Sequence, residues 1–147
     1  MLALQDAGFE LLLPFGENTR FDLVIEVNSR LVKVQCKTGR LKNGAIFFSP
    51  CSTYGHHRHA AKARRAYTDQ VDFFGVYCPE TGGAYLVPIA DVLAKTRAAL
   101  RVSPSRNRQT RGVRFAAEYL IGHVRVERNA GATAEPGAWP GAGGSCA

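Results

Sequence analysis

The stretch that most constrains this chain runs from residue 21 to residue 37 and reads FDLVIEVNSRLVKVQCK. Two runs rich in Val, Ile and Leu, residues that favour strands, flank the dipeptide Asn28-Ser29. That dipeptide suits a two-residue turn, although less well than Asn-Gly would. The stretch therefore predicts a β-hairpin.

The register of this hairpin would bring polar side chains together. If the dipeptide forms the loop, Asp22 lies directly opposite Gln35, and strand alternation places Lys37 on the same face as Gln35. Directly opposed residues have Cβ atoms roughly 4.5–5.5 Å apart. A slip of one residue would separate the pair. The predicted register gathers a carboxylate, an amide oxygen and an ammonium at the strand ends away from the turn.

Length and composition indicate one small domain. The chain has 147 residues, of which 46% are hydrophobic. It holds no apolar run near the ~20 residues that a membrane span needs, and its start lacks the basic segment of a signal peptide. Its four cysteines show no C-x-x-C spacing. This pattern favours a reduced, cytoplasmic protein, with a zinc site as the alternative.

The net charge of +7 is unevenly distributed along the chain. Residues 1–29 hold five acidic side chains against one basic, whereas residues 30–70 hold nine basic against one acidic. A basic block beside an acidic segment indicates a polyanionic partner, with acids available for a metal ion. A soluble domain that is merely basic is the alternative.

The rest of the chain predicts short strands and helices around the hairpin. Strands are expected at residues 9–15, 45–48, 71–77, 84–87 and 98–102. Helical segments are expected at residues 1–9, 60–66, 89–93 and 115–120. Together they predict an α+β domain over residues 1–122, with a mixed β-sheet of about five or six strands flanked by short helices. Residues 123–147 become rich in Gly, Ala and Pro and predict a disordered tail.

Four groups of residues are candidates for contact with nucleic acid. They are Arg40 and Lys42 in a basic turn; His56, His57 and Arg58 in a loop; Lys62, Arg64 and Arg65 in a short helix; and Arg106, Asn107, Arg108, Gln109 and Arg111 in a basic segment. Lys and Arg neutralise phosphates, and Arg, Asn and Gln can read base edges. A surface loop without function and a transition-metal site are the alternatives for the histidines. A solvated face is the alternative for the helix.

The pattern Phe21-Asp22 followed by Gln35-Cys36-Lys37 resembles the PD-(D/E)XK nuclease superfamily, in a form with glutamine in place of the second acid. Longer segments resemble the branch that contains group I intron-encoded homing endonucleases and their bacterial relatives. These segments are LLPFGENTRFDL, VQCKTGR, CSTYGHH and VDFFGVYCPETGGAYLVP. The resemblance spans roughly residues 11 to 119 and implies a restriction-endonuclease-like core.

The resemblance also implies a reaction: hydrolysis of DNA phosphodiester bonds with Mg²⁺, or alternatively Mn²⁺, leaving a 5′-phosphate. It makes Asp22 the main metal ligand, Gln35 a ligand through its side-chain oxygen, and Cys36 a ligand through its backbone carbonyl. Lys37 would orient or activate the attacking water. Glu17, in the loop before the hairpin, is a further candidate ligand. Mg²⁺ prefers such hard oxygen ligands.

Double-stranded DNA is the implied partner, bound by a homodimer on a quasi-palindromic site. Two departures from the family pattern leave an alternative open. Gln35 is neutral, and the expected first helix is short, with Asp6 as its only acid. The alternative is a catalytically weak or inactive nuclease-fold module that binds nucleic acid. Cleavage of RNA or of DNA junctions is a third reading, because a fold does not fix a substrate.

Overall fold

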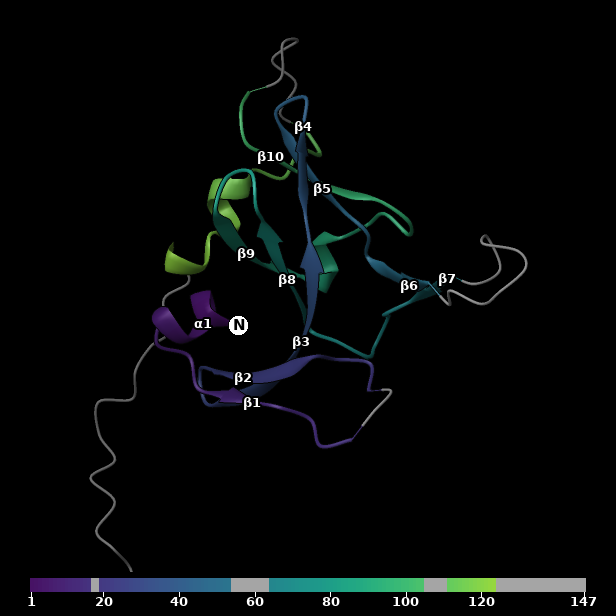
Figure 1. Ribbon diagram of the computed structural model, residues 1–147. Helices are drawn as coiled ribbons and strands as arrows, with labels where there is room; N and C mark the ends of the chain where they lie inside the picture. Colours follow the sequence, from purple (N-terminus) through teal and green to yellow (C-terminus); the bar gives the residue numbers. More distant parts are fainter. Residues whose placement is uncertain (17–18, 54–63, 105–110, 124–147) are drawn as a thin grey trace, which may run out of the picture.

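The computed structural model describes residues 1–16, 19–53, 64–104 and 111–123 (Figure 1). The first half contains α1 (Leu2–Asp6), β1 (Leu11–Leu12), β2 (Leu23–Val27), β3 (Arg30–Thr38), β4 (Arg40–Lys42), β5 (Ala45–Phe48) and β6 (Cys51–Thr53). The second half contains β7 (Arg64–Ala66), β8 (Phe73–Cys78), β9 (Gly83–Pro88), β10 (Ala98–Arg101) and three 3₁₀ turns, η1 (Ile89–Asp91), η2 (Ala116–Tyr119) and η3 (Ile121–His123).

A central mixed sheet organises the fold. Its strand order is β1-β2-β3-β8-β9, in which β3 and β8 run parallel and the other neighbours run antiparallel. A second sheet has the order β10-β5-β4, and β6 pairs with β7 alone. The predicted α+β architecture with a mixed sheet and short helices is therefore confirmed.

The hairpin of β2 and β3 has the predicted register. Leu23 pairs with Val34 and Val27 pairs with Arg30. The two turn residues, Asn28 and Ser29, have φ angles of 50° and 59°. Positive φ at both positions is the geometry of a type I′ turn, whose twist matches that of the flanking strands.

The central sheet is buried on both faces by two apolar clusters. On one face, Leu23 and Val34 pack with Leu4 of α1. On the other face, Phe74 of β8 packs with Phe48 of β5. Because side chains alternate along β3, Val34 faces α1 while Gln35 and Lys37 face the side of β5 and β6. Figure 1 shows α1 and the β6–β7 pair on opposite sides of β3.

Gly39 joins the central sheet to the second sheet. Its N–H donates to the carbonyl of Tyr77 at 2.7 Å, and β4 begins at the next residue. A Cβ atom at Gly39 would lie 2.5 Å from Cγ2 of Ile46 and 3.1 Å from Cγ1 of Val76. The chain therefore needs a residue without a side chain where it passes from β3 to β4.

The structure corrects several predicted elements. The strand expected at residues 9–15 is limited to Leu11–Leu12, because Phe9 turns into the core beside Leu4 and Pro14 has no N–H to donate. Residues 60–66 were predicted to be helical, but Arg64–Ala66 is β7, which pairs with β6. The basic turn contains β4, and β10 belongs to the second sheet.

Within the described ranges, no helix has the length and apolarity needed to cross a membrane. Cys36, Cys51 and Cys78 are free thiols. Residues 124–147, which include Cys146 and most of the predicted tail, lie outside the described residues.

Candidate active site

Asp22 lies one residue before β2, and three hydrogen bonds fix it beside β3. Its backbone N–H donates to the carbonyl of Val34 at 2.9 Å. Its Oδ2 accepts a bond from the N–H of Cys36 at 2.7 Å and another from Nε2 of Gln35 at 2.5 Å. The strand ladder ends at the pair Leu23–Val34. Beyond that pair, the carboxylate of Asp22 serves as the strand partner of Cys36.

Gln35 presents its amide nitrogen to two oxygen atoms. Nε2 lies 2.5 Å from Oδ2 of Asp22 and 3.5 Å from the carbonyl oxygen of Cys36. This differs from the predicted orientation, in which the amide oxygen faces the site. An ionised carboxylate only accepts hydrogen bonds, so the donor end of the amide faces it. Rotation about the last side-chain bond exchanges the two ends, and would bring a third oxygen to this place.

The atoms around Nε2 of Gln35 suit a small hard cation. Carboxylate, peptide carbonyl and amide oxygens are ligand types that Mg²⁺ accepts, and Mg²⁺ keeps several waters when it binds. In the described part of the chain, no three His, Cys, Asp or Glu side chains are grouped to hold a metal ion. Glu17, the further candidate ligand, lies outside the described residues. The donor set fits a cation held by one carboxylate and several waters.

Lys37 lies on the same face of β3, but its ammonium bonds away from Asp22. Nζ donates to the hydroxyl of Tyr67 at 3.1 Å and to the carbonyl of Cys51 at 3.3 Å. It also lies 4.6 Å from the centre of the Tyr67 ring. Among the described residues, no carboxylate is within ion-pair distance of this ammonium. The structure thus brings Asp22 and Gln35 into direct contact and holds Lys37 through other elements.

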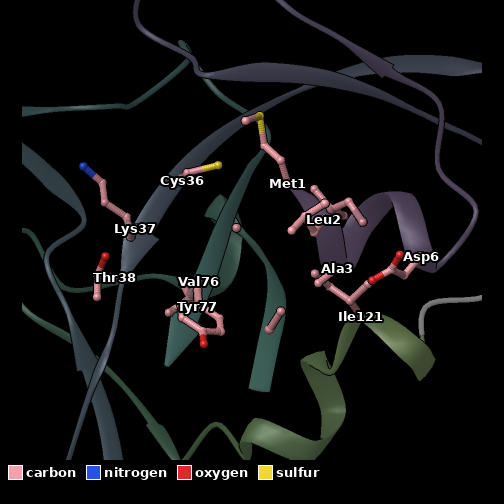
Figure 2. A pocket seen from close by; sticks show the side chains of 13 residues that line it. Met1, Leu2, Ala3, Asp6, Cys36, Lys37, Thr38, Val76, Tyr77 and Ile121 are labelled. Atoms are coloured by element: carbon pink, nitrogen blue, oxygen red, sulfur yellow. The ribbon is translucent and has the colours of Figure 1, made fainter. Parts of the chain in front are cut away.

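Cys36 reaches the site through its backbone only. Figure 2 shows its side chain turned toward Met1 and that of Lys37 turned away from Met1. Burial raises the pKa of the Cys36 thiol, and the charge of Asp22 raises it further, while the N-terminal amine and Lys37 lower it. A thiol with a raised pKa stays protonated near neutral pH and is a poor nucleophile. At this position the peptide group, and not the thiol, is therefore the part of Cys36 that can act in the site.

A cavity of about 680 Å³ lies between α1 and the strands β3 and β8, and Cys36, Lys37 and Thr38 of β3 are among the residues that line it. Its walls are mostly apolar, and among the described residues that line it Asp6 is the one with an acidic side chain. Figure 2 shows Asp6 and Lys37 on opposite sides of the cavity. The only acid of α1 therefore lies on the face of β3 that Cys36 occupies, away from the face of Gln35.

The site thus combines an acid at a strand start, a tight antiparallel turn, and a Gln-x-Lys segment on the central strand. A sequence profile of the PD-(D/E)XK endonuclease family matches residues 1–121. The chain belongs to this family. The match includes every described element of the central sheet.

The PD-(D/E)XK chain is also similar to a solved structure, that of a bacterial homing endonuclease, I-Ssp6803I. The two share 24% sequence identity with a TM-score of 0.61, and the match covers 81% of this chain and 79% of the other. At this identity, the likeness concerns the fold. No curated protein matches the chain.

Sequence reasoning missed Arg20, which lies two residues before Asp22 in this PD-(D/E)XK chain. Its guanidinium stacks 4.3 Å above the Tyr67 ring. Its three nitrogens donate to the side chains of Gln70 and Ser52 and to the carbonyl of Ala66. Arg20 lies in a bend before β2, where no periodic pattern of the sequence could have placed its side chain.

The predicted nucleic-acid contacts are only partly described. All of those within the described ranges are exposed: Arg40, Lys42, Arg64, Arg65 and Arg111. The others lie outside the described residues: His56, His57, Arg58, Lys62, Arg106, Asn107, Arg108 and Gln109. Arg40 also lies 3.7 Å from Glu80, an exposed pair whose strength is modest.

A shallow groove of about 490 Å³ begins next to Lys37. Its lining comprises Thr38, Phe47, Phe48, Ser49, Arg64, Thr96 and Arg97. The guanidinium of Arg97, a residue that the sequence did not single out, lies 3.9 Å from the centre of the Phe47 ring. Two arginines and three hydroxyl side chains make this groove polar and basic, as a phosphate backbone requires.

Proposed function

We propose that this protein is a metal-dependent endonuclease that hydrolyses phosphodiester bonds of double-stranded DNA. One observation carries the proposal: Nε2 of Gln35 lies between Oδ2 of Asp22 and the carbonyl oxygen of Cys36. These groups gather oxygen ligands at the end of a hairpin, one residue from Lys37. Membership of an endonuclease family supports the same reading.

Asp22, Gln35 and the Cys36 carbonyl would hold the cation, for which Mg²⁺ is the best fit and Mn²⁺ the second. When bound, it supplies charge that stabilises the phosphorane-like transition state and lowers the pKa of a coordinated water. The peptide N–H of Cys36 keeps the Asp22 carboxylate in place, because it donates to Oδ2 at 2.7 Å. The Gln35 amide would present its oxygen to the cation.

Lys37 supplies the second fixed charge of the proposed mechanism. It would orient the attacking water and stabilise the negative charge that develops on the phosphate oxygens. Its contacts with Tyr67 and Cys51 keep the ammonium on the Gln35 face of β3. The basic groove that starts at Thr38 would take the phosphate backbone next to the bond that is cut. The homodimer implied by the family resemblance stays a prediction.

A nicking assay tests the catalytic proposal. Supercoiled plasmid is incubated with the protein and Mg²⁺ or Mn²⁺, alongside Asp22→Ala and Lys37→Ala. We expect each variant to nick at least about 100-fold more slowly, since removing one charge-stabilising group costs ~10²–10³ in rate. Cleavage should stop when the cation is chelated.

Lys33→Ala is the matched control, because Lys33 is an exposed lysine of β3 whose ammonium lies near Phe21 instead of the site. It should nick like the parent protein. Equal nicking by the parent and both active-site variants would contradict the proposal, as would the absence of nicking in all of them.

The alternative is a DNA-binding module with little or no activity. Two observations favour it: Gln35 is neutral, and Asp6 lies across the cavity from Lys37. This alternative predicts tight, salt-sensitive binding of duplex DNA without metal-dependent nicking. Binding measured by fluorescence anisotropy beside the nicking assay separates the two proposals.

A further inference from the structure

The ammonium of Lys37 is held by residues from outside its own strand. The hydroxyl of Tyr67 accepts a bond from it at 3.1 Å and the carbonyl of Cys51, in β6, accepts another at 3.3 Å. A free lysine side chain loses rotamer entropy on being fixed. The two acceptors offset that cost and select one position for the charge.

Tyr67 is itself rigidly placed. It is 5% exposed, and its ring meets that of Phe74 edge-on, with centroids 5.8 Å apart and planes at 81°. Phe74 is the partner of Gln35 in the ladder between β8 and β3. The hydroxyl that holds Lys37 is therefore anchored to the strand that flanks the site.

Arg20 braces Tyr67 from another direction. Its guanidinium stacks on the ring at 4.3 Å and donates to Gln70, Ser52 and Ala66. Because Nε, Nη1 and Nη2 each donate a hydrogen bond to another group of the protein, Arg20 has a structural role and is not available to bind a phosphate. It ties the segment before β2 to the β6–β7 pair.

These contacts close a ring around the site. One route from Asp22 to Lys37 passes through the side chain of Gln35 and the peptide N–H of Cys36 into β3. The other leaves Asp22 along the chain to Arg20, crosses the stack to Tyr67 and ends at the ammonium of Lys37. Two independent routes fix the distance between the carboxylate and the ammonium more firmly than one.

We propose that Tyr67, braced by Arg20, is a positioning residue that sets the place of the Lys37 ammonium relative to Asp22. This inference rests on the proposed nuclease function for its catalytic consequence, but the contact itself does not. Tyr67 touches neither the cation nor the DNA in this proposal; it acts through Lys37.

Tyr67→Phe is the decisive variant, because it keeps the ring, its packing on Phe74 and the Arg20 stack, and removes only the hydroxyl. We expect single-turnover cleavage about 10- to 100-fold slower, as for a misplaced catalytic group, with DNA affinity within about twofold of the parent. In a Lys37→Ala background, the same change should have no further effect. An unchanged or faster rate, or an additive effect in that background, would overturn the proposal.

Chemical labelling tests the contact without activity. The protein is acetylated with an N-hydroxysuccinimide ester, and labelling is followed peptide by peptide. Tyr67→Phe should label Lys37 at least about threefold faster, because one hydrogen bond to its ammonium is lost. Lys42, an exposed lysine of β4, should label at the same rate in both proteins and is the internal control.

The two readouts separate two failures. A parent protein that cleaves no DNA but shows faster Lys37 labelling in Tyr67→Phe would defeat the proposed function and leave the positioning contact standing. Unchanged labelling of Lys37 would overturn the positioning role whether or not DNA is cut. Arg20→Lys keeps the charge but loses the planar fork, and should increase Lys37 labelling in the same direction.

Discussion

At the residue scale, the site depends on one amide where an acid is more usual. Gln35 contacts both Asp22 and the carbonyl of Cys36, so a carboxylate in its place would face the same point. Metal affinity rises with the number of charged ligands. Near Asp22, however, a second carboxylate is repelled until a cation is bound.

Gln35→Glu should therefore lower the metal concentration that cleavage requires. We expect the Mg²⁺ concentration for half-maximal nicking to fall about tenfold, because the site gains one negative ligand. A titration of nicking rate against Mg²⁺ measures this. Gln5→Glu, which adds the same charge on exposed α1, should leave the titration unchanged. Identical titrations for the parent and Gln35→Glu would argue against Gln35 as a metal ligand.

The contact of Asp22 with Gln35 could be predicted because it depends on a local hairpin. The turn and the alternation of side chains in this hairpin can both be recognised within 17 residues. The sequence could not predict Tyr67 and Arg20 as neighbours of the site. Their bonds join residues separated by 30 to 50 positions, and no periodicity reports such contacts. The orientation of the Gln35 amide likewise depends on its hydrogen-bond partner and not on its place in the strand.

At the element scale, strand pairing overrode helix propensity. The sequence AAKARRA is rich in helix formers, yet Arg64–Ala66 pairs with Cys51–Thr53 as β7. The strands β5, β8 and β9 were predicted within two residues of their observed ends because apolar runs and turn residues delimit them. The assignment of β10 to the second sheet depends on a pairing with β5 about 50 residues away in sequence, which no local signal reports.

Gly39 is the position at which this arrangement of elements is most easily disturbed. Gly39→Ala would place a methyl group against Ile46 and Val76, and we expect the free energy of unfolding to fall by about 1–3 kcal/mol, as for other overpacked sites. Urea denaturation measures the change. Gly122→Ala, where a Cβ atom would meet nothing within 4 Å, is the control and should be close to neutral. Equal stability of the two variants would show that the passage from β3 to β4 tolerates a side chain.

At the scale of the whole molecule, the proposed DNA path follows a basic groove that begins at Thr38, the residue after Lys37. Arg64 and Arg97 line the groove that begins at Thr38. A steep salt dependence of the affinity would identify such a partner, because bound phosphates release counterions.

We expect the affinity for duplex DNA to fall steeply as salt is raised, and Arg64→Ala and Arg97→Ala each to reduce the slope of log affinity against log salt by about 1. Arg30→Ala is the matched control, since Arg30 is an exposed arginine at the turn end of the hairpin. Anisotropy titrations at several salt concentrations measure the slopes. A slope unchanged by both groove variants would remove this groove from the DNA path.

The turned-away thiol of Cys36 has a consequence for how this protein is studied. Its peptide group joins the proposed cation site while its side chain faces the cavity beside α1. Replacement of Cys36 by alanine would therefore report on packing alone and would not test the proposed role of its carbonyl in holding the cation. An amide-to-ester replacement of the peptide bond between Cys36 and Lys37, made by semisynthesis, can measure this contribution of the main chain.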